Sequence, residues 1–137
     1  MRFILSLVFI LSFYSALFSQ EKFLEVSITP RLFSGDKVKN TTLIVNTLEG
    51  AVFEIQAKKK KTTFFLPAGE KYTISIEKDG FHPTFYDIDL RDAPREKKKK
   101  NRQQLELIPY LHKQDSERPI PVAHYRFDEK RGKVVKD

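Results

Sequence analysis

Three histidines, His82, His112 and His124, are the first candidates for chemistry, because imidazole serves both as a metal ligand and as a general base. A zinc site needs three or four converging ligands, usually at a spacing such as HExxH, and no such spacing occurs in this chain. His82 lies between Phe81 and Pro83 at a predicted turn, and the other two lie in or near the C-terminal segment. The pattern predicts exposed or half-buried histidines, no metal site and no cofactor.

Two carboxylates, Asp87 and Asp89, alternate along the segment TFYDIDL. If Phe85 is off their face, both lie on the outward face of a strand, where they could hold a cation weakly. Solvated carboxylates are far commoner at such positions. The sequence also lacks the GxSxG, P-loop and Ser/His/Asp patterns of hydrolases and nucleotide-binding enzymes. We therefore expect no catalytic residue and no enzymatic activity.

Two runs of four lysines are the strongest charge features of the chain. Such runs can bind anionic polymers, here acidic glycans, lipopolysaccharide phosphates or nucleic acid. The alternative is that they keep the domain soluble and protect the edges of a sheet. Neither run contains an aromatic residue that could strengthen polymer binding. The candidate anion-binding residues are Lys58, Lys59, Lys60, Lys61, Lys97, Lys98, Lys99 and Lys100.

The N-terminal segment has the pattern of a secretory signal peptide. Arg2 is its only charge, an apolar run extends from Phe3 to Phe18, and the polar start Gln20-Glu21-Lys22 follows Ser19. The run is interrupted by serines and is shorter than the roughly 20 residues that span a bilayer. We expect a cleaved signal over 1–19 and no transmembrane segment after cleavage; a membrane anchor is the competing interpretation.

Composition limits the remaining chain further. The 137 residues allow one domain, and the net charge is +7. Cysteine is absent, which excludes disulfides, Cys-based zinc sites, thiol catalysis and a lipid anchor on cysteine. Stability must then come from packing and from a hydrogen-bonded sheet. The expected location is the periplasm or cell surface of a Gram-negative bacterium, so no nucleic-acid partner is expected.

After position 20 the apolar residues alternate with a period of two, and no window of eleven or more residues favours an amphipathic helix. The pattern predicts an all-β fold, a single antiparallel sandwich of about seven strands. Its boundaries are 20–112, with a solvated basic loop over 91–104, and a polar tail over 113–137 has room for one extra strand. The predicted strands are Leu24–Thr29, Thr41–Thr47, Ala51–Ala57, Thr62–Leu66, Lys71–Lys78, Thr84–Leu90 and Leu105–Leu111.

The segment 62–83, TTFFLPAGEKYTISIEKDGFHP, carries a resemblance to a known family. It resembles the carboxypeptidase regulatory-like and PEGA-type domains of exported bacterial proteins, whose phrase is Pro-x-Gly, a Tyr-x-Ile/Val-x-Val strand and Lys-x-Gly-Tyr/Phe. The downstream chain also resembles a group of such proteins. The matching residues are Leu66, Pro67, Gly69, Tyr72, Ile74, Ile76, Lys78, Gly80 and Phe81, and downstream Ile88, Asp89, Pro94, Pro119, Ile120, Ala123 and Tyr125.

The resemblance implies a transthyretin-like (prealbumin-like) β-sandwich, and covers about 26–127. One departure is that Val26-Ser27-Ile28-Thr29 stands where the regulatory-like family has a glycine-rich opening, so the strand order at the N-terminal edge stays open. Members of this family are mostly non-catalytic modules. We therefore expect a binding or assembly module whose partner is an envelope protein or glycan; the alternative is an anion-binding envelope protein that uses its lysine loops on acidic glycan or lipopolysaccharide.

Cleavage after Ser19 is the first testable prediction. N-terminal sequencing of the exported protein should yield Gln20 as the first residue, because the polar switch follows a short apolar segment with small residues. Intact Met1 in the membrane fraction would show instead that the segment is an anchor.

Overall fold

The computed structural model describes residues 22–50, 52–94, 103–115 and 122–137. Within these ranges the chain is all-β: it forms nine strands and no helix, which confirms the predicted class. The strands are β1 (Leu24–Ile28), β2 (Thr41–Thr47), β3 (Val52–Ala57), β4 (Thr62–Leu66), β5 (Lys71–Glu77), β6 (Thr84–Asp89), β7 (Gln103–Leu107), β8 (Ala123–Asp128) and β9 (Lys133–Lys136).

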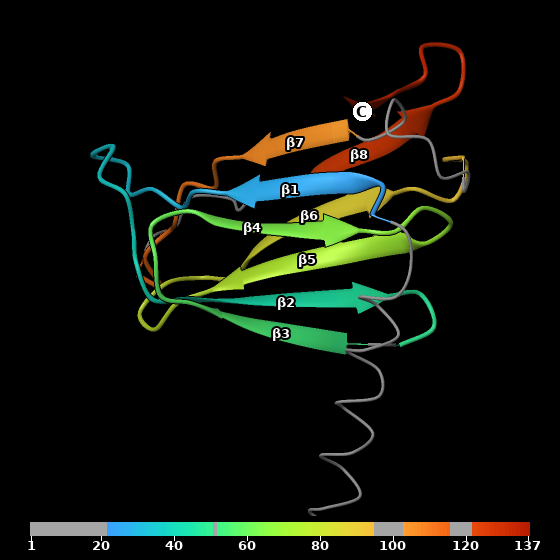
Figure 1. Ribbon diagram of the computed structural model, residues 1–137. Coiled ribbons are helices and arrows are strands. Elements are labelled where there is room, and N and C mark those ends of the chain that lie inside the picture. The colour runs from blue at the N-terminus through green and yellow to red at the C-terminus, as the bar shows by residue number, and fades with distance from the viewer. Residues whose placement is uncertain (1–21, 51, 95–102, 116–121) are drawn as a thin grey trace, which may run out of the picture.

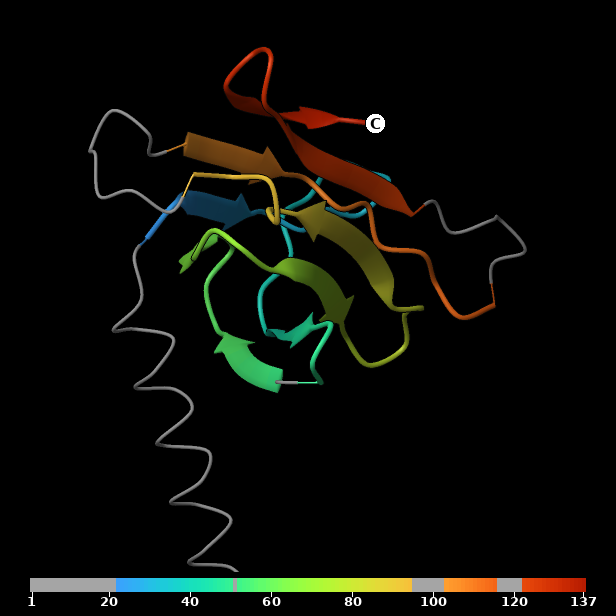
Figure 2. The same cartoon turned by 90° about the vertical axis from the view of Figure 1, so that its right-hand side faces the viewer.

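The strands form two sheets that face each other. One has three strands in the order β4-β1-β7, and the other has six in the order β3-β2-β5-β6-β8-β9. The six-stranded sheet curves around the three-stranded one, which lies along its concave face (Figures 1 and 2). This arrangement lets each sheet cover the apolar face of the other.

The core lies between the sheets and follows directly from the period-two pattern. In β5, Tyr72, Ile74 and Ile76 are fully buried, as predicted, and the apolar residues of β1 and β2 that alternate with polar ones are buried in the same way. Phe81, also predicted to face the core, is half-buried and packs against its margin. The alternation thus predicted the buried face of these strands correctly.

The turn before β5 is held by a buried hydrogen bond. The Tyr72 hydroxyl donates to the carbonyl oxygen of Pro67 at 2.8 Å. Burial, together with the nearby Glu70 carboxylate, raises the pKa of Tyr72 above its ordinary value. Gly69 has a positive φ of 95° and its N–H donates to the Leu90 carbonyl, so this turn is also tied to the end of β6.

The predicted antiparallel arrangement of about seven strands is corrected by two parallel pairs. β7 pairs in parallel with β1, and β8 pairs in parallel with β6, so both sheets are mixed. Parallel neighbours require a long connection that returns the chain to the same end of the sheet. Here residues 29–102 separate β1 from β7, and residues 90–122 separate β6 from β8. Local alternation carries no information about such pairing, which is why the sequence pattern missed it.

The segment 113–137 contributes more than the single extra strand that the sequence allowed. Both β8 and β9 lie in it and extend the six-stranded sheet beyond β6. In β8 the side chains of Ala123, Tyr125 and Phe127 face the core, whereas His124 and Arg126 are exposed. The alternation of apolar Ala123, Tyr125 and Phe127 with polar residues is the sequence pattern that indicates β8.

One residue of the predicted loop 91–104 joins the two sheets. Gln103 begins β7; its Nε2 donates to the carbonyl of Gly132 and its Oε1 accepts from the Val134 N–H, both at 2.6 Å. These bonds connect the three-stranded sheet to the β8–β9 hairpin at the edge of the other sheet.

Replacing Ile74 by Ala should lower the free energy of unfolding by about 2–5 kcal/mol, because the side chain is fully buried and lies between Val45 and Tyr86 on the neighbouring strands. Ile44→Ala is the matched control, since Ile44 lies on the outer, half-exposed face of β2 and should cost much less. Denaturant unfolding monitored by circular dichroism measures both. Equal losses in the two variants would contradict the assignment of the inner face.

Candidate functional site

The histidines do not converge. His112 is buried, His82 is half-buried and His124 is exposed on β8. His82 and His112 meet only through the backbone, where the His82 N–H donates to the His112 carbonyl at 2.8 Å. Across the described ranges, no three His, Asp or Glu side chains lie close enough to hold a metal ion.

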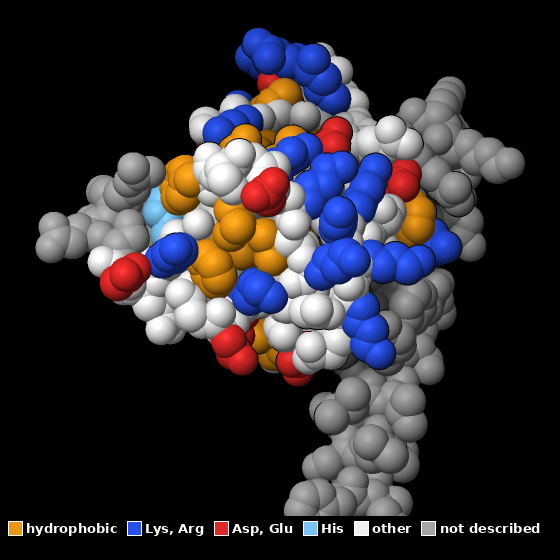
Figure 3. Space-filling view, turned by 90° about the vertical axis from the view of Figure 1, so that its left-hand side faces the viewer, with side chains coloured by type: hydrophobic (Ala, Val, Ile, Leu, Met, Phe, Trp, Pro, Cys, Tyr) orange, Lys and Arg blue, Asp and Glu red, His pale blue; other side chains and the backbone are white. Residues whose placement is uncertain are grey.

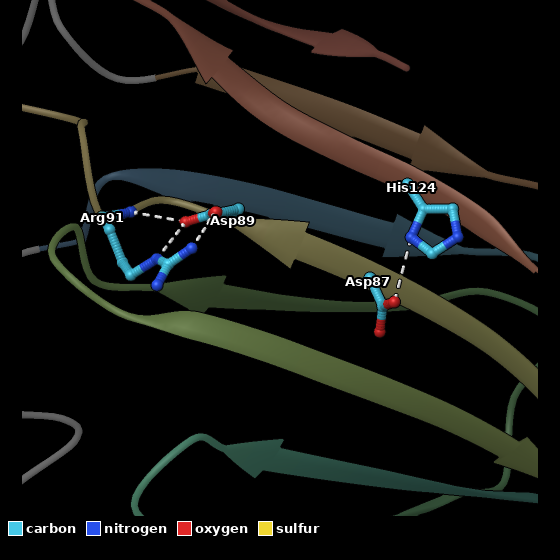
Figure 4. A network of polar contacts seen from close by, with 4 residues as sticks. All are labelled: Asp87, Asp89, Arg91 and His124. Atoms are coloured by element: carbon cyan, nitrogen blue, oxygen red, sulfur yellow. Dashed lines mark hydrogen bonds and ion pairs between the residues drawn. The ribbon is translucent and has the colours of Figure 1, made fainter.

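Asp87 and Asp89 lie on the outer face of β6, as expected, but Phe85 shares that face. The condition that Phe85 lies off this face is not met, because residues two apart on a strand point to the same side. Figure 4 shows that the two carboxylates turn to different partners rather than toward a common point. Asp87 accepts a hydrogen bond from the Thr73 hydroxyl at 3.1 Å, and its other oxygen lies 3.0 Å from Nδ1 of His124.

Asp89 is held by the residue two positions ahead of it. The Arg91 guanidinium donates through Nε and Nη2 to the two carboxylate oxygens, at 3.0 and 2.8 Å, and the Arg91 N–H donates to the same group. The hydrogen bonds from the Arg91 side chain lower the pKa of Asp89, with partial burial opposing them, and the same contact raises the pKa of Arg91. This carboxylate is thereby occupied by its own chain.

Arg91→Gln should therefore raise the pKa of Asp89 toward its ordinary value, which carboxyl titration by NMR measures. Because the folded pKa is depressed, the contact stabilises the protein above the ordinary pKa of an aspartate, and this stabilisation is lost as the pH falls through the folded value. Arg131→Gln, at the β8–β9 turn beside Asp128, is the control and should leave Asp89 unchanged. A pKa of Asp89 that does not respond to Arg91→Gln would refute the assignment.

Only one of the two lysine runs lies within the described residues. Lys58–Lys61 connects β3 to β4, all four residues are exposed, and none forms an ion pair with any residue in the described part of the chain. Lys97–Lys100 lies outside the described residues. The nearest described residues on either side of it, Pro94 and Gln103, belong to the end of the sheets away from Lys58–Lys61, because Gln103 pairs with the first residue of β1.

Four connecting segments meet at the end of the molecule that carries Lys58–Lys61. Ile28, the last residue of β1, pairs with Thr62 and Leu107, so the segments that precede β4 and follow β7 emerge beside it. We call this the loop end; it lies at the left of Figure 1 and comprises 29–40, 58–61, 78–83 and 108–115. These segments contain nine Lys or Arg and three Asp residues. The result is a strongly basic end.

Two aromatic side chains are exposed at the loop end. Phe33 and Tyr110 are 54% and 47% exposed, and their rings stack with centroids 5.9 Å apart. Phe33 also makes an edge contact with the ring of His112 at 4.9 Å. We call Phe33 and Tyr110 the aromatic pair. Neighbouring Ile108 is 41% exposed and lies on the same side of its segment as Tyr110.

Backbone hydrogen bonds fix the aromatic pair in place. Arg31 forms a bridge with Lys37, which closes a short hairpin around Phe33, and a second bridge with Tyr110. The Arg31 guanidinium donates to the carbonyl of Gly35 at 2.9 Å, and Gly35 has the positive φ that the turn requires. The rings are therefore positioned by the scaffold and not by a partner.

Figure 3 shows the loop end in face view, with hydrophobic side chains near its middle and Lys and Arg side chains gathered beside them. The lysines of this surface could be predicted from the sequence, but the aromatic pair could not. The lysine run contains no aromatic residue, and the fold supplies aromatics from segments about 25 and 50 positions away. The available signal was Phe33 itself, a large apolar residue beside the polar turn Ser34-Gly35-Asp36-Lys37.

Comparison with protein-family models and with curated proteins finds no match to this chain. Among the described residues, no helix has the length and hydrophobicity to cross a bilayer.

Proposed function

We propose that this chain is a non-catalytic binding module, exported to the periplasm or cell surface of a Gram-negative bacterium, that engages an envelope protein or glycan through its loop end. The observation that carries the proposal is the exposed, preformed aromatic pair on a strongly basic end of the domain. Exposed aromatic side chains on rigidly held loops are typical of binding surfaces, since burying them on a partner is favourable and little conformational entropy is lost.

We also propose that the fold is a transthyretin-like sandwich of the carboxypeptidase regulatory-like and PEGA type. Two facing sheets are compatible with it, and the residues of the shared phrase have structural roles here. Pro67 accepts the Tyr72 hydroxyl bond, and Gly69 and Gly80 have positive φ at the turns on either side of β5. These roles explain why such a phrase recurs in a sandwich with this turn, and modules of this type are mostly not enzymes.

Replacing both members of the aromatic pair by Ser should abolish recovery of the envelope partner from a membrane and periplasmic extract. The matched control is Leu48→Ser with Val52→Ser, two exposed apolar residues at the opposite end of the sheets. Quantitative mass spectrometry of the proteins and glycans captured by each variant measures the difference. A partner retained by the aromatic variant and lost by the control would move the binding surface to the opposite end.

Anion binding is the second candidate function, and the unpaired state of Lys58–Lys61 favours it. Lysines that form no ion pair within the described chain keep their charge available for phosphate or sulfate groups. Lys37, Lys39 and Lys113 lie in the other loop-end segments and are also exposed, so an acidic glycan or lipopolysaccharide would meet more than one basic loop.

Changing Lys58–Lys61 to Ser should weaken binding to heparin, a soluble sulfated glycan, and wild-type binding should fall steeply with salt. Stability should change by only a few tenths of a kcal/mol per position, since all four side chains are exposed. Changing Lys97–Lys100, the other candidate run, to Ser removes the same charge, so a comparison of the two variants separates the effect of position from that of net charge. If the wild-type protein does not bind heparin even at low salt, the four lysines serve solubility and edge protection only.

A further inference from the structure

Exposed apolar side chains gather at the loop end. Eight large hydrophobic residues are exposed in the described chain, and half of them lie in or directly beside the loop-end segments; Leu48 and Val52 lie at the opposite end, and Phe65 and Phe85 lie on the outer faces of the sheets. Single exposed hydrophobic residues need no explanation, but a group at one end of a domain does. The four are Phe33, Ile108, Tyr110 and Val122.

The hairpin around Phe33 extends beyond the ends of the strands (Figure 1). It is a firm projection, because the Leu32 N–H donates to the Asp36 carbonyl and the Gly35 N–H donates back to the Leu32 carbonyl, both at 2.9 Å. A projecting apolar ring that is held in place can enter a soft apolar layer before the rest of the domain makes contact.

The positive charge around this projection favours a layer whose surface is anionic. Lys37 belongs to the hairpin itself, and Lys58–Lys61 and Lys113 come from two further segments of the same end; all of them are exposed. Juxtamembrane lysines are attracted to anionic lipid headgroups, each increasing binding about fivefold. Tyr favours the headgroup level of a bilayer, because its ring is apolar and its hydroxyl is polar. Phe has no polar group and inserts with other apolar side chains at the boundary between headgroups and acyl chains.

We infer that the loop end docks on an anionic lipid surface, with Phe33 and Tyr110 entering the headgroup layer and the loop-end lysines contacting the lipid phosphates. A soluble acidic glycan would contact the lysines but has no acyl layer for the apolar side chains of Phe33 and Ile108 to enter. This inference rests on the proposed binding function of the loop end and adds an anionic lipid surface to the envelope protein or glycan proposed for it.

The test uses the exported protein after processing and replaces Phe33 by Trp, which introduces a single fluorophore of this type because the chain has no Trp. Vesicles of phosphatidylcholine with about 30% phosphatidylglycerol serve as the anionic surface, and pure phosphatidylcholine vesicles serve as the neutral one. With anionic vesicles the Trp emission should shift to the blue and be quenched by brominated acyl chains. Leu48→Trp, at the opposite end and 64% exposed, should show neither change.

Two further variants separate the contributions. Changing Lys58–Lys61 to Ser should reduce vesicle binding in a sedimentation assay at least about tenfold, whereas the same change at Lys97–Lys100 should have a smaller effect. Adding Tyr110→Ser to the Phe33→Trp variant should reduce the quenching of the introduced indole. Thermal unfolding of each variant confirms that it is folded before its binding is compared.

Several results would overturn the inference. An unshifted Phe33→Trp spectrum, or a shift at Leu48→Trp instead, would show that this end does not enter the bilayer. Equal binding to heparin and to anionic vesicles without quenching would assign a soluble glycan instead of a lipid surface. In each of these cases the proposed binding function survives if the aromatic variant still loses the envelope partner, so the two failures are distinguishable.

Discussion

The pairing of β1 brings the lysine run and the aromatic segment to the same end of the domain. β1 is the middle strand of its sheet, and its inner residues Leu24, Val26 and Ile28 are fully buried. A shift of one residue would turn that face outward, so the core fixes the register. Because Ile28 then lies between Thr62 and Leu107, the lysine run before β4 and the aromatic segment after β7 must emerge at the same end.

The same pairing explains how the sheets are completed without disulfides. β7 joins β1 in parallel only after the chain has passed through β6, and Gln103 then binds the β8–β9 hairpin of the other sheet. On the other side, Phe53 of β3 and Phe64 of β4 meet edge to face with centroids 6.3 Å apart. Each side of the domain is thus connected by a contact between the two sheets, one polar and one aromatic.

The strands that alternate apolar and polar residues could be predicted from the sequence, whereas the pairing between strands could not. Period-two alternation is a local property, so β1, β2 and β5 were recognised within a residue or two. The parallel pairs, the role of Gln103 and the second strand after residue 113 depend on contacts between segments far apart in the chain. The local pattern of a single sequence does not show which distant segments come into contact. The candidate site divides in the same way: Lys58–Lys61 is visible as a run of like charges, whereas the meeting of Phe33 with Tyr110 depends on the bridges from Arg31.

The position of Lys58–Lys61 is compatible with both of its interpretations. The run connects β3 and β4, each of which is an edge strand of its sheet, and lysines beside edge strands discourage pairing with other chains. That structural role requires only charge, however, and is indifferent to what lies on the neighbouring loops. An exposed, backbone-fixed aromatic pair contributes nothing to edge protection and increases the hazard of association. The aromatic pair is therefore the feature that edge protection does not explain, and it separates the proposed binding surface from a solubility device.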